Sequence, residues 1–164
     1  MIRVAVITVS DSAIAGTRQD VSGPAVRERA ESFGWTVASH ELVPDESDQI
    51  ADALRRKADS GEVSVILTTG GTGVALRDIT PEATRSVMQR EIPGLGELMR
   101  SEGRKFTSKA VLSRGLAGLR GRTLIVNLPG SPKGAVESLD AIAKLIPHVV
   151  DLLEGRTDHF ENQT

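Results

Sequence analysis

The sequence contains no cysteine among its 164 residues. This absence excludes disulfide bonds, thiolate nucleophiles and thiolate metal ligands. Aromatic residues make up only 2% of the chain, which leaves too few rings for the stacking surface on which single-stranded nucleic acids bind. The formal net charge of -2 gives no positive field to attract a nucleic acid. We therefore expect no nucleic-acid partner.

Long apolar runs are also missing. No segment approaches the ~18 uncharged apolar residues that a membrane-spanning helix requires. The N-terminal sequence MIRVAVITVSDS has one arginine and a short β-branched run without a small-residue cleavage site. It indicates a first strand rather than a signal peptide. We expect a cytoplasmic protein without a membrane partner.

The length and composition fit one globular domain. With 39% hydrophobic and 26% charged residues, the chain can build a sizeable core. A chain of this length suits one domain better than two. No repeat or linker interrupts it, and only its last residues, GRTDHFENQT, are uniformly polar. We expect a single domain at residues 1–155 and a polar tail at 156–164.

Four apolar segments predict β-strands. Each is short and rich in β-branched residues, and the third is apolar throughout, as expected of a strand that is covered on both faces. Helical segments separate them, which predicts a three-layer α/β/α fold with a mainly parallel sheet. The predicted strands are residues 2–9, 35–43, 63–69 and 123–128.

The intervening helices are predicted from apolar residues at helical spacing and from their start signals. We expect one helix to begin at Ser22 and Pro24, Ser47 to cap a second, and the hydroxyl of Thr80 to cap a third. Near the C-terminus, a continuous apolar stripe over residues 139–153 predicts one long helix that is kinked near Pro147.

The segments that follow the predicted strands share one chemistry. Ligands of parallel sheets bind outside the carboxyl ends of the strands, where these segments meet. They contain hydroxyls, glycines, carboxylates and one lysine, whereas the opposite strand ends carry no comparable set. The segments are residues 10–12, 44–47, 70–82 and 127–134.

The third segment follows directly from a strand as TTGGTG, residues 68–73. Gly70, Gly71 and Gly73 have no Cβ, so their backbone N–H groups can converge on one anion. The hydroxyls of Thr69 and Thr72 can add donors. The loop is neither a P-loop nor a G-x-G-x-x-G loop. A tight turn that only packs a strand against a helix would account for the glycines equally well.

The last segment predicts a second phosphate site. Ser131 is expected to cap a helix whose first residue is Pro132, so the positive end of a helix opens at the rim. Lys133 would lie in the first turn, where the helix dipole disfavours a cation by ~0.3–1 kcal/mol unless an anion is bound. The alternative is a lysine that points to solvent.

Two acidic residues are candidates for metal binding. Asp45 and Asp78 fall on different loops of the same rim, and Mg²⁺ held by one or two carboxylates commonly clamps phosphates. Arg77 is a candidate partner for a phosphate. Taken separately, each acid is also explained as an ordinary loop residue. No nucleophile motif or histidine cluster offers a competing chemistry.

Several spaced motifs resemble one known family. The stretches TTGGTGVALRDITPEAT, EIPGLGELMR, LSRGLAG and NLPGSPKGA are similar to the molybdenum cofactor biosynthesis proteins of the Mog and MoaB type, and the resemblance spans residues 3–154. It implies the molybdopterin-binding α/β fold and a molybdopterin adenylyltransferase, a nucleotidyltransferase with ATP and molybdopterin as substrates and Mg²⁺ as cofactor. It also implies a homotrimer, or a hexamer in the MoaB-like branch, and a molybdenum-insertion enzyme downstream.

The resemblance also implies roles for individual residues. Asp45 and Asp78 match acids tied to catalysis and metal binding, the glycine loop matches one that contacts phosphates, and Ser113 matches a serine associated with molybdopterin. Ser131 stands where some relatives carry Asn or Gln, which leaves the hydrogen bonding of that loop open. The residues expected to contact substrate or nucleotide are Ser10, Asp11, Thr69, Gly70, Gly71, Thr72, Gly73, Ser113, Pro129, Gly130, Ser131 and Lys133.

Three other functions stay open at this point. A MoaB-like protein would bind molybdopterin without adenylylating it, although the presence of Asp45 and Asp78 favours the enzyme. The single-domain length disfavours a molybdate-inserting enzyme, and the missing G-x-G-x-x-G disfavours a dehydrogenase. In the adenylyltransferase, the terminal phosphate of the substrate is itself the nucleophile. The protein then has to supply only positioning and charge neutralisation.

Overall fold

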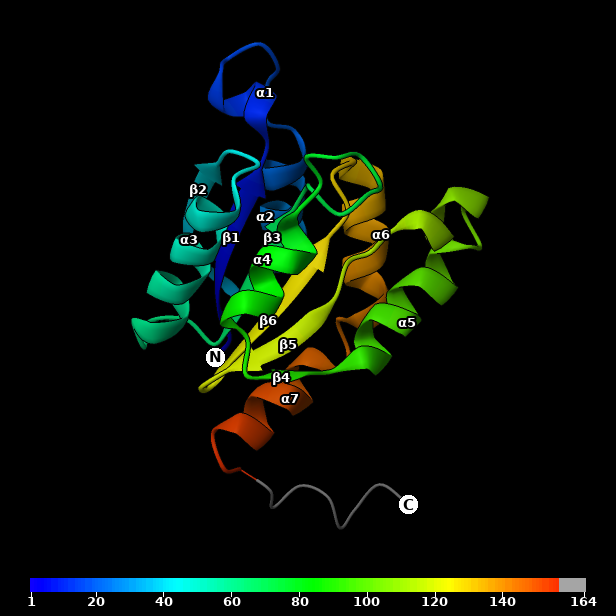
Figure 1. Cartoon of the computed structure of the whole chain (residues 1–164). Coiled ribbons are helices and arrows are strands. Elements are labelled where there is room, and N and C mark those ends of the chain that lie inside the picture. Colours follow the sequence, from blue (N-terminus) through cyan, green and yellow to red (C-terminus); the bar gives the residue numbers. More distant parts are fainter. Residues whose placement is uncertain (157–164) are drawn as a thin grey trace.

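The computed structural model describes residues 1–156. A six-stranded sheet forms the middle of three layers, in the order β2-β1-β3-β6-β5-β4 (Figure 1). β1, β2, β3 and β6 run parallel, while β5 pairs antiparallel with both β6 and β4. This confirms the α/β/α fold with a mainly parallel sheet. The strands are Arg3–Val9 (β1), Thr36–Val43 (β2), Val65–Thr69 (β3), Arg90–Glu91 (β4), Ala117–Arg120 (β5) and Thr123–Leu128 (β6).

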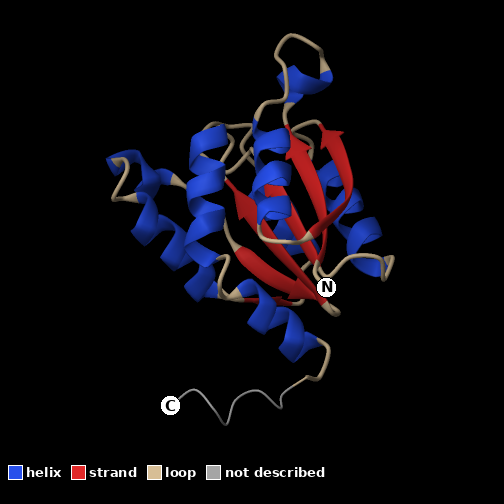
Figure 2. Cartoon of the chain, turned by 180° about the vertical axis from the view of Figure 1, so that it is seen from behind, coloured by secondary structure: helices blue, strands red, loops and turns tan. Residues whose placement is uncertain are grey.

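Helices cover both faces of the sheet. α2, α5 and α6 lie on the face seen in Figure 2, α3 and α4 lie on the other, and α1 projects beyond the carboxyl ends of the parallel strands (Figure 1). None of the helices in the described part of the chain is long and apolar enough to cross a bilayer. The helices are Asp11–Ile14 (α1), Ser22–Ser32 (α2), Ser47–Asp59 (α3), Thr80–Val87 (α4), Pro93–Gly103 (α5), Pro132–Ile142 (α6) and Ile146–Leu153 (α7), with a 3₁₀ helix, η1, at Ser108–Leu112.

The sheet divides the apolar core into two layers. Side chains alternate along a strand, so Leu67 of β3 faces the layer that contains α2 and α6, while its neighbour Ile66 faces α3 and α4. Both are 0% exposed. This burial on both faces explains why β3 is apolar throughout, and it makes the strand a rigid base for the loop that follows it.

The predicted helix start at Ser22 is confirmed, but the two predicted helix caps, Ser47 and Thr80, are wrong. Ser22 and Ser47 are the first helical residues of α2 and α3. The residues before them, Val21 and Glu46, make no capping hydrogen bond with their side chains. At α2 the carboxylate of Asp20 instead accepts a hydrogen bond from the amide of Gly23 at 2.9 Å. Thr80 also lies inside its helix, and its hydroxyl serves another purpose described below. A hydroxyl caps only when its residue is extended and precedes the helix, and neither Ser47 nor Thr80 does so.

The predicted C-terminal helix is two helices. α6 ends at Ile142 and α7 begins at Ile146, so the expected kink is a complete break. Pro147 lies in the first turn of α7, where the amide that proline lacks has no partner in a helix. Apart from Arg156, the predicted polar tail at 156–164 lies outside the described residues.

Candidate active site

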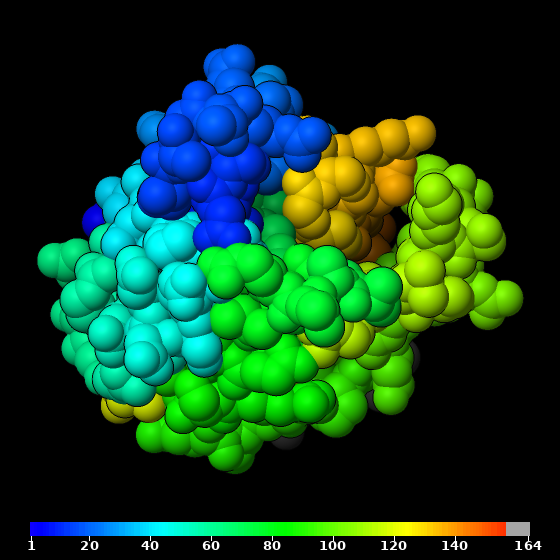
Figure 3. Space-filling model, turned by 45° about the horizontal axis from the view of Figure 1, so that its top comes forward, coloured from blue at the N-terminus to red at the C-terminus, as the bar shows by residue number. Residues whose placement is uncertain are grey.

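The strand order creates a crevice at one edge of the sheet. β1 lies between β2 and β3, so the chain leaves β1 toward one side and β3 leads toward the other. At such a switch point the loops diverge and leave room for a ligand. Figure 3 looks onto this edge, where a hollow lies between the yellow residues that follow β6 and the yellow-green stretch between α5 and β5. We call that stretch, residues 104–113, the arm.

The crevice has two compartments. The loop compartment, about 750 Å³, lies among the loops that follow β1, β2 and β3. The arm compartment, about 560 Å³, lies between the glycine loop, α6 and the arm. Four residues line both compartments and therefore mark their junction. They are Gly71, Asp78, Gly130 and Ser131.

The glycine loop turns sharply at two residues. Gly70 and Gly71 have φ angles of 108° and 69°, a region that residues with a Cβ rarely adopt, whereas Gly73 does not need it. The amide of Gly70 donates to the carbonyl of Leu128 at 3.1 Å, and its own carbonyl accepts from the hydroxyl of Thr80 at 2.9 Å. The expected phosphate donor Gly70 is therefore engaged by the protein itself.

The residues after Gly70 are the ones whose amides are available. Within residues 1–156, the amides of Gly71, Thr72 and Gly73 donate to no protein acceptor. Thr69 is fully buried, and its hydroxyl donates to the carbonyl of Pro129 at 2.7 Å. Thr69 thus ties the glycine loop to the loop after β6. The available amides of the glycine loop therefore begin at Gly71, one residue later than predicted.

The N-terminus of α6 completes the junction. Ser131 caps it as predicted, because its Oγ accepts from the amide of Gly134 at 3.0 Å. Gly130 packs against the glycine loop, where an added Cβ would lie 3.3 Å from the Cα of Gly70. Lys133 lines neither compartment: its side chain is 86% exposed, and its Nζ lies 3.9 Å from Glu137. Lys133 therefore points to solvent, which was the alternative to a role in phosphate binding.

The two candidate carboxylates both line the loop compartment. Oδ2 of Asp45 accepts from the amide of Asp11 at 2.9 Å, and Oδ2 of Asp78 accepts from the amide of Ala75 at 3.0 Å. The Oδ1 atoms of both residues accept no hydrogen bond from the described residues. Each acid is therefore fixed through one oxygen, while the other can serve a ligand.

Asp11 and Arg77 lock the neighbouring loops together. Asp11 accepts from the amide of Asp45 at 2.9 Å, and the guanidinium of Arg77 binds Asp11 at 2.6 Å and Glu46 at 2.9 Å. The hydrogen bond from Arg77 holds the pKa of Asp11 below its ordinary value. Ser10 acts locally, because its Oγ caps α1 by accepting from the amide of Ala13 at 3.2 Å. Arg77 is thus engaged by carboxylates, not poised for a phosphate.

Burial raises the pKa of Asp45, an effect that the hydrogen bond from Asp11 opposes and the charges of Asp11 and Asp78 reinforce. A raised folded-state pKa means that ionised Asp45 costs stability once the pH rises through that pKa. We therefore expect Asp45→Asn to raise the free energy of unfolding at pH 7 by up to about 1 kcal/mol. The gain should vanish below the ordinary pKa of 3.8, where both states carry a proton. Urea unfolding at the two pH values checks this, and a loss of stability at pH 7 would contradict it.

These donors suit a cation that is shared with a ligand. Among the described residues, no group of three or more acidic or histidine side chains surrounds one point. Two carboxylate oxygens alone do not complete a metal shell, but Mg²⁺ normally adds phosphate oxygens and water. The donor chemistry of Asp45 and Asp78 therefore fits Mg²⁺ in the presence of a phosphate ligand.

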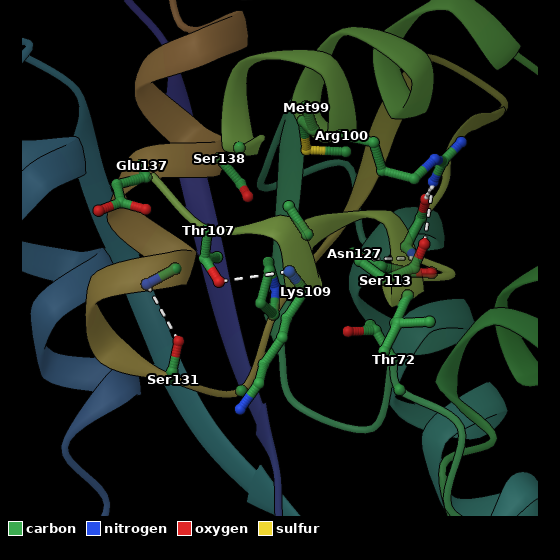
Figure 4. Close-up of a pocket in the computed structure, with 18 of the residues that line it drawn as sticks. Thr72, Met99, Arg100, Thr107, Lys109, Ser113, Asn127, Ser131, Glu137 and Ser138 are labelled. Carbon is green, nitrogen blue, oxygen red and sulfur yellow. Dashed lines mark hydrogen bonds between the residues drawn. The ribbon is translucent and has the colours of Figure 1, made fainter. Parts of the chain in front are cut away.

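The arm compartment combines predicted residues with four that the sequence patterns did not single out, namely Arg100, Lys109, Glu137 and Ser138. Figure 4 shows Glu137 and Ser138 of α6 on one side, Ser113 and Thr72 on the other, and Lys109 extending into the opening. Arg100 of α5 borders it and donates to the carbonyl of Gly115 at 2.8 Å. The basic stretch GRKFTSK, residues 103–109, contains Lys109, but it does not distinguish Lys109 from its basic neighbours. Ser113, Gly73 and Pro129 line this compartment as well.

The chain is similar to proteins of known name over most of its length. Residues 5–148 match the family described as probable molybdopterin binding domain. The molybdopterin adenylyltransferase of Helicobacter pylori (strain J99) is 44% identical over 94% of this chain and 89% of its own. That of Escherichia coli K12 is 38% identical over 94% of this chain and 86% of its own. The crystal structure of the molybdopterin biosynthesis enzyme MoaB from Thermus thermophilus is 54% identical, with a TM-score of 0.89 over 94% of this chain and 98% of its own.

Proposed function

The chain belongs to the family of molybdopterin-binding domains, and from this premise we propose that it is a molybdopterin adenylyltransferase. The enzyme transfers AMP from ATP to the terminal phosphate of molybdopterin and releases pyrophosphate. One observation carries the proposal: two compartments meet at a junction that combines a glycine loop, a helix N-terminus and a carboxylate. We also propose that residues 1–155 form a single domain of this family.

The reaction explains why a junction is needed. An oxygen of the molybdopterin phosphate forms a bond to the α-phosphorus of ATP, and the bond from that phosphorus to the oxygen of the β-phosphate breaks. The attacking phosphate is ionised at neutral pH, so no side chain has to remove a proton. Catalysis then requires only that two anionic groups are held in line and that their charge is neutralised. The phosphates of both substrates must therefore meet at one point between two binding spaces.

We assign molybdopterin to the arm compartment and ATP to the loop compartment. The arm compartment combines the apolar side chains of Met99 and Leu112 with Ser113 and Arg100, which suits a flat heterocycle with polar edges. The loop compartment contains Asp45 and Asp78, which suits the triphosphate of a nucleotide with its cation. The amides of Gly71 and Thr72 would then donate to the phosphates that meet between them.

The proposal includes Mg²⁺. Asp45 and Asp78 would hold it through their unengaged Oδ1 atoms, and the bound ion would neutralise charge on the phosphate oxygens of ATP. The Arg77–Asp11 pair keeps the loop of Asp45 in place for this purpose. A cytoplasmic homotrimer, or a hexamer, that supplies a molybdenum-insertion enzyme remains part of the proposal from the resemblance of the sequence.

Pyrophosphate release tests the proposed function directly. Purified protein is incubated with Mg²⁺ and ATP, with and without molybdopterin, and pyrophosphate is measured. We expect release only when molybdopterin and Mg²⁺ are both present, because the acceptor phosphate is the nucleophile. Binding of molybdopterin without release of pyrophosphate would instead identify a MoaB-like binding protein. Release that is independent of molybdopterin would identify an ATP-hydrolysing enzyme and reject the transferase.

A further inference from the structure

Arg114 makes an unusual set of hydrogen bonds next to the junction. It follows Ser113 and precedes β5. Its amide donates to the carbonyl of Thr72 at 2.8 Å, and its Nε donates to the carbonyl of Gly73 at 2.7 Å. Its Nη2 donates to the carbonyl of Asp78 at 2.5 Å, and its Nη1 binds the carboxylate of Glu82. One residue therefore holds both ends of the segment 72–78.

Apart from Arg114, Arg77 holds the segment from outside, because it binds Asp11 and Glu46 on the loops that follow β1 and β2. Val74 and Leu76 at its tip are 70% and 99% exposed, so burial contributes little to its conformation. Inside the segment, Asp78 and Ala75 bond to each other, and just outside it the amide of Thr80 donates to the carbonyl of Gly71 at 3.1 Å. These bonds shape the turn but do not attach it to the arm. The attachment depends on Arg114.

We propose that Arg114 is a positioning residue that fixes Asp78 relative to the arm compartment. The inference rests on the proposed adenylyltransferase function. The guanidinium donates a hydrogen bond to the main-chain carbonyl of Asp78, while the neighbouring Ser113 lines the arm compartment. Through this contact the carboxylate assigned to ATP and Mg²⁺ keeps a set distance from the space assigned to molybdopterin. Arg114 touches neither substrate in this arrangement.

The chemistry of the contact requires arginine. A guanidinium is planar and offers its donors in a rigid fork, so it can bind Gly73, Asp78 and Glu82 at once. A lysine ammonium concentrates its charge at one point and cannot reach the same three acceptors. Burial acts to raise the pKa of Glu82, but the hydrogen bonds from Arg114 and from its own amide outweigh it and keep the pKa low. The partner thus remains an anion for the guanidinium.

Arg114→Lys tests the inference, and Arg120→Lys is the matched control. The guanidinium of Arg120 also binds several acceptors at once, namely the carboxylate of Asp59 at 2.9 and 3.0 Å and the carbonyl of Val87 at 2.8 Å. Arg120 lines neither compartment. For Arg114→Lys we expect kcat for pyrophosphate release to fall about 10- to 100-fold, because a displacement of about 1 Å is enough for such losses. The KM values for ATP and molybdopterin should change less than about threefold, since the binding groups themselves are intact. Arg120→Lys should change neither parameter.

Hydrogen exchange gives a readout that does not depend on activity. The amides of Ala75, Asp78 and Thr80 are hydrogen-bonded, and their exchange should become faster in Arg114→Lys and stay unchanged in Arg120→Lys. If Arg114→Lys does not fold, Glu82→Gln is the second variant. It weakens the interaction between Arg114 and the carboxylate of residue 82, and it should lower kcat in the same way but to a smaller degree. Wild-type kcat in the Arg114 variant would overturn the inference. A wild-type protein that releases no pyrophosphate would instead reject the proposed function, and exchange alone would then decide whether Arg114 holds the segment.

Discussion

Asp78→Asn is expected to lower kcat for molybdopterin-dependent pyrophosphate release by about 10²–10³-fold, the typical loss when one preorganised electrostatic group is removed from a transition state. Asp78 lines both compartments, so its carboxylate lies where charge develops between the two substrates. The substitution keeps an oxygen that can accept the 3.0 Å hydrogen bond from Ala75, and it removes only the negative charge. The loop conformation should therefore survive while binding of the cation fails.

The measurement compares kcat, the dissociation constant for molybdopterin and the urea midpoint of Asp78→Asn with those of the wild type. Asp140→Asn is the matched control, because Asp140 is a surface acid that binds Arg29 at 2.7 Å and lines neither compartment. We expect the control to retain full activity and the Asp78 variant to retain both its midpoint and its affinity for molybdopterin. Full activity of Asp78→Asn, or its unfolding, would contradict the assigned role.

The layers of the fold follow from local patterns in the sequence. An apolar strand such as β3 must be covered on both faces, and the helices between the strands can cover it only in a three-layer arrangement. The cap of α6 was equally readable, because Ser131 and Pro132 act on residues within one turn of themselves. Both features are determined by residues close together in the sequence, and a local sequence pattern can therefore predict them.

Contacts between distant residues could not be predicted in this way. The hydroxyl of Thr80 looked like a helix cap, but the turn at Gly70 and Gly71 brings the Gly70 carbonyl within 2.9 Å of it. Arg77 looked available for a phosphate, yet Asp11, 66 residues earlier, takes its guanidinium. In both cases a partner that is remote in the sequence competed successfully with the expected one.

The arm compartment was also hidden from sequence patterns. It lies between the arm on one side and the glycine loop and α6 on the other, and these segments are brought together by the packing of α5 against α6 and β5, not by any pattern within the arm. The glycine loop and the two acids could be identified because glycines and carboxylates gather at strand ends. Lys109 and Arg114 sit on or beside the arm among other basic residues, where nothing in the local pattern distinguishes a residue that lines the site from one that faces water.

Gly70→Ala is expected to have the largest effect on stability, a loss of about 2–5 kcal/mol in the free energy of unfolding. The left-handed conformation alone costs a residue with a Cβ about 1–2 kcal/mol. At Gly70 the φ angle is 108°, and an added Cβ would also lie 2.2 Å from the carbonyl oxygen of Val9, which belongs to the backbone of β1. Such an overlap cannot be relieved by rotating a side chain, and forced overpacking adds about 1–3 kcal/mol.

Gly34→Ala separates these two contributions. Gly34 has a φ angle of 85°, and no heavy atom lies within 4 Å of the position of an added Cβ, so only the conformational cost applies. Urea unfolding should therefore place Gly34→Ala about 1–2 kcal/mol below the wild type and Gly70→Ala clearly below both. Equal losses would show that the backbone at Val9 yields easily. In that case the glycine loop would be softer than its hydrogen bonds to Leu128 and Thr80 imply. Any Gly70→Ala protein that still folds should release pyrophosphate slowly, because a shifted Gly70 displaces Gly71 from the junction of the two compartments.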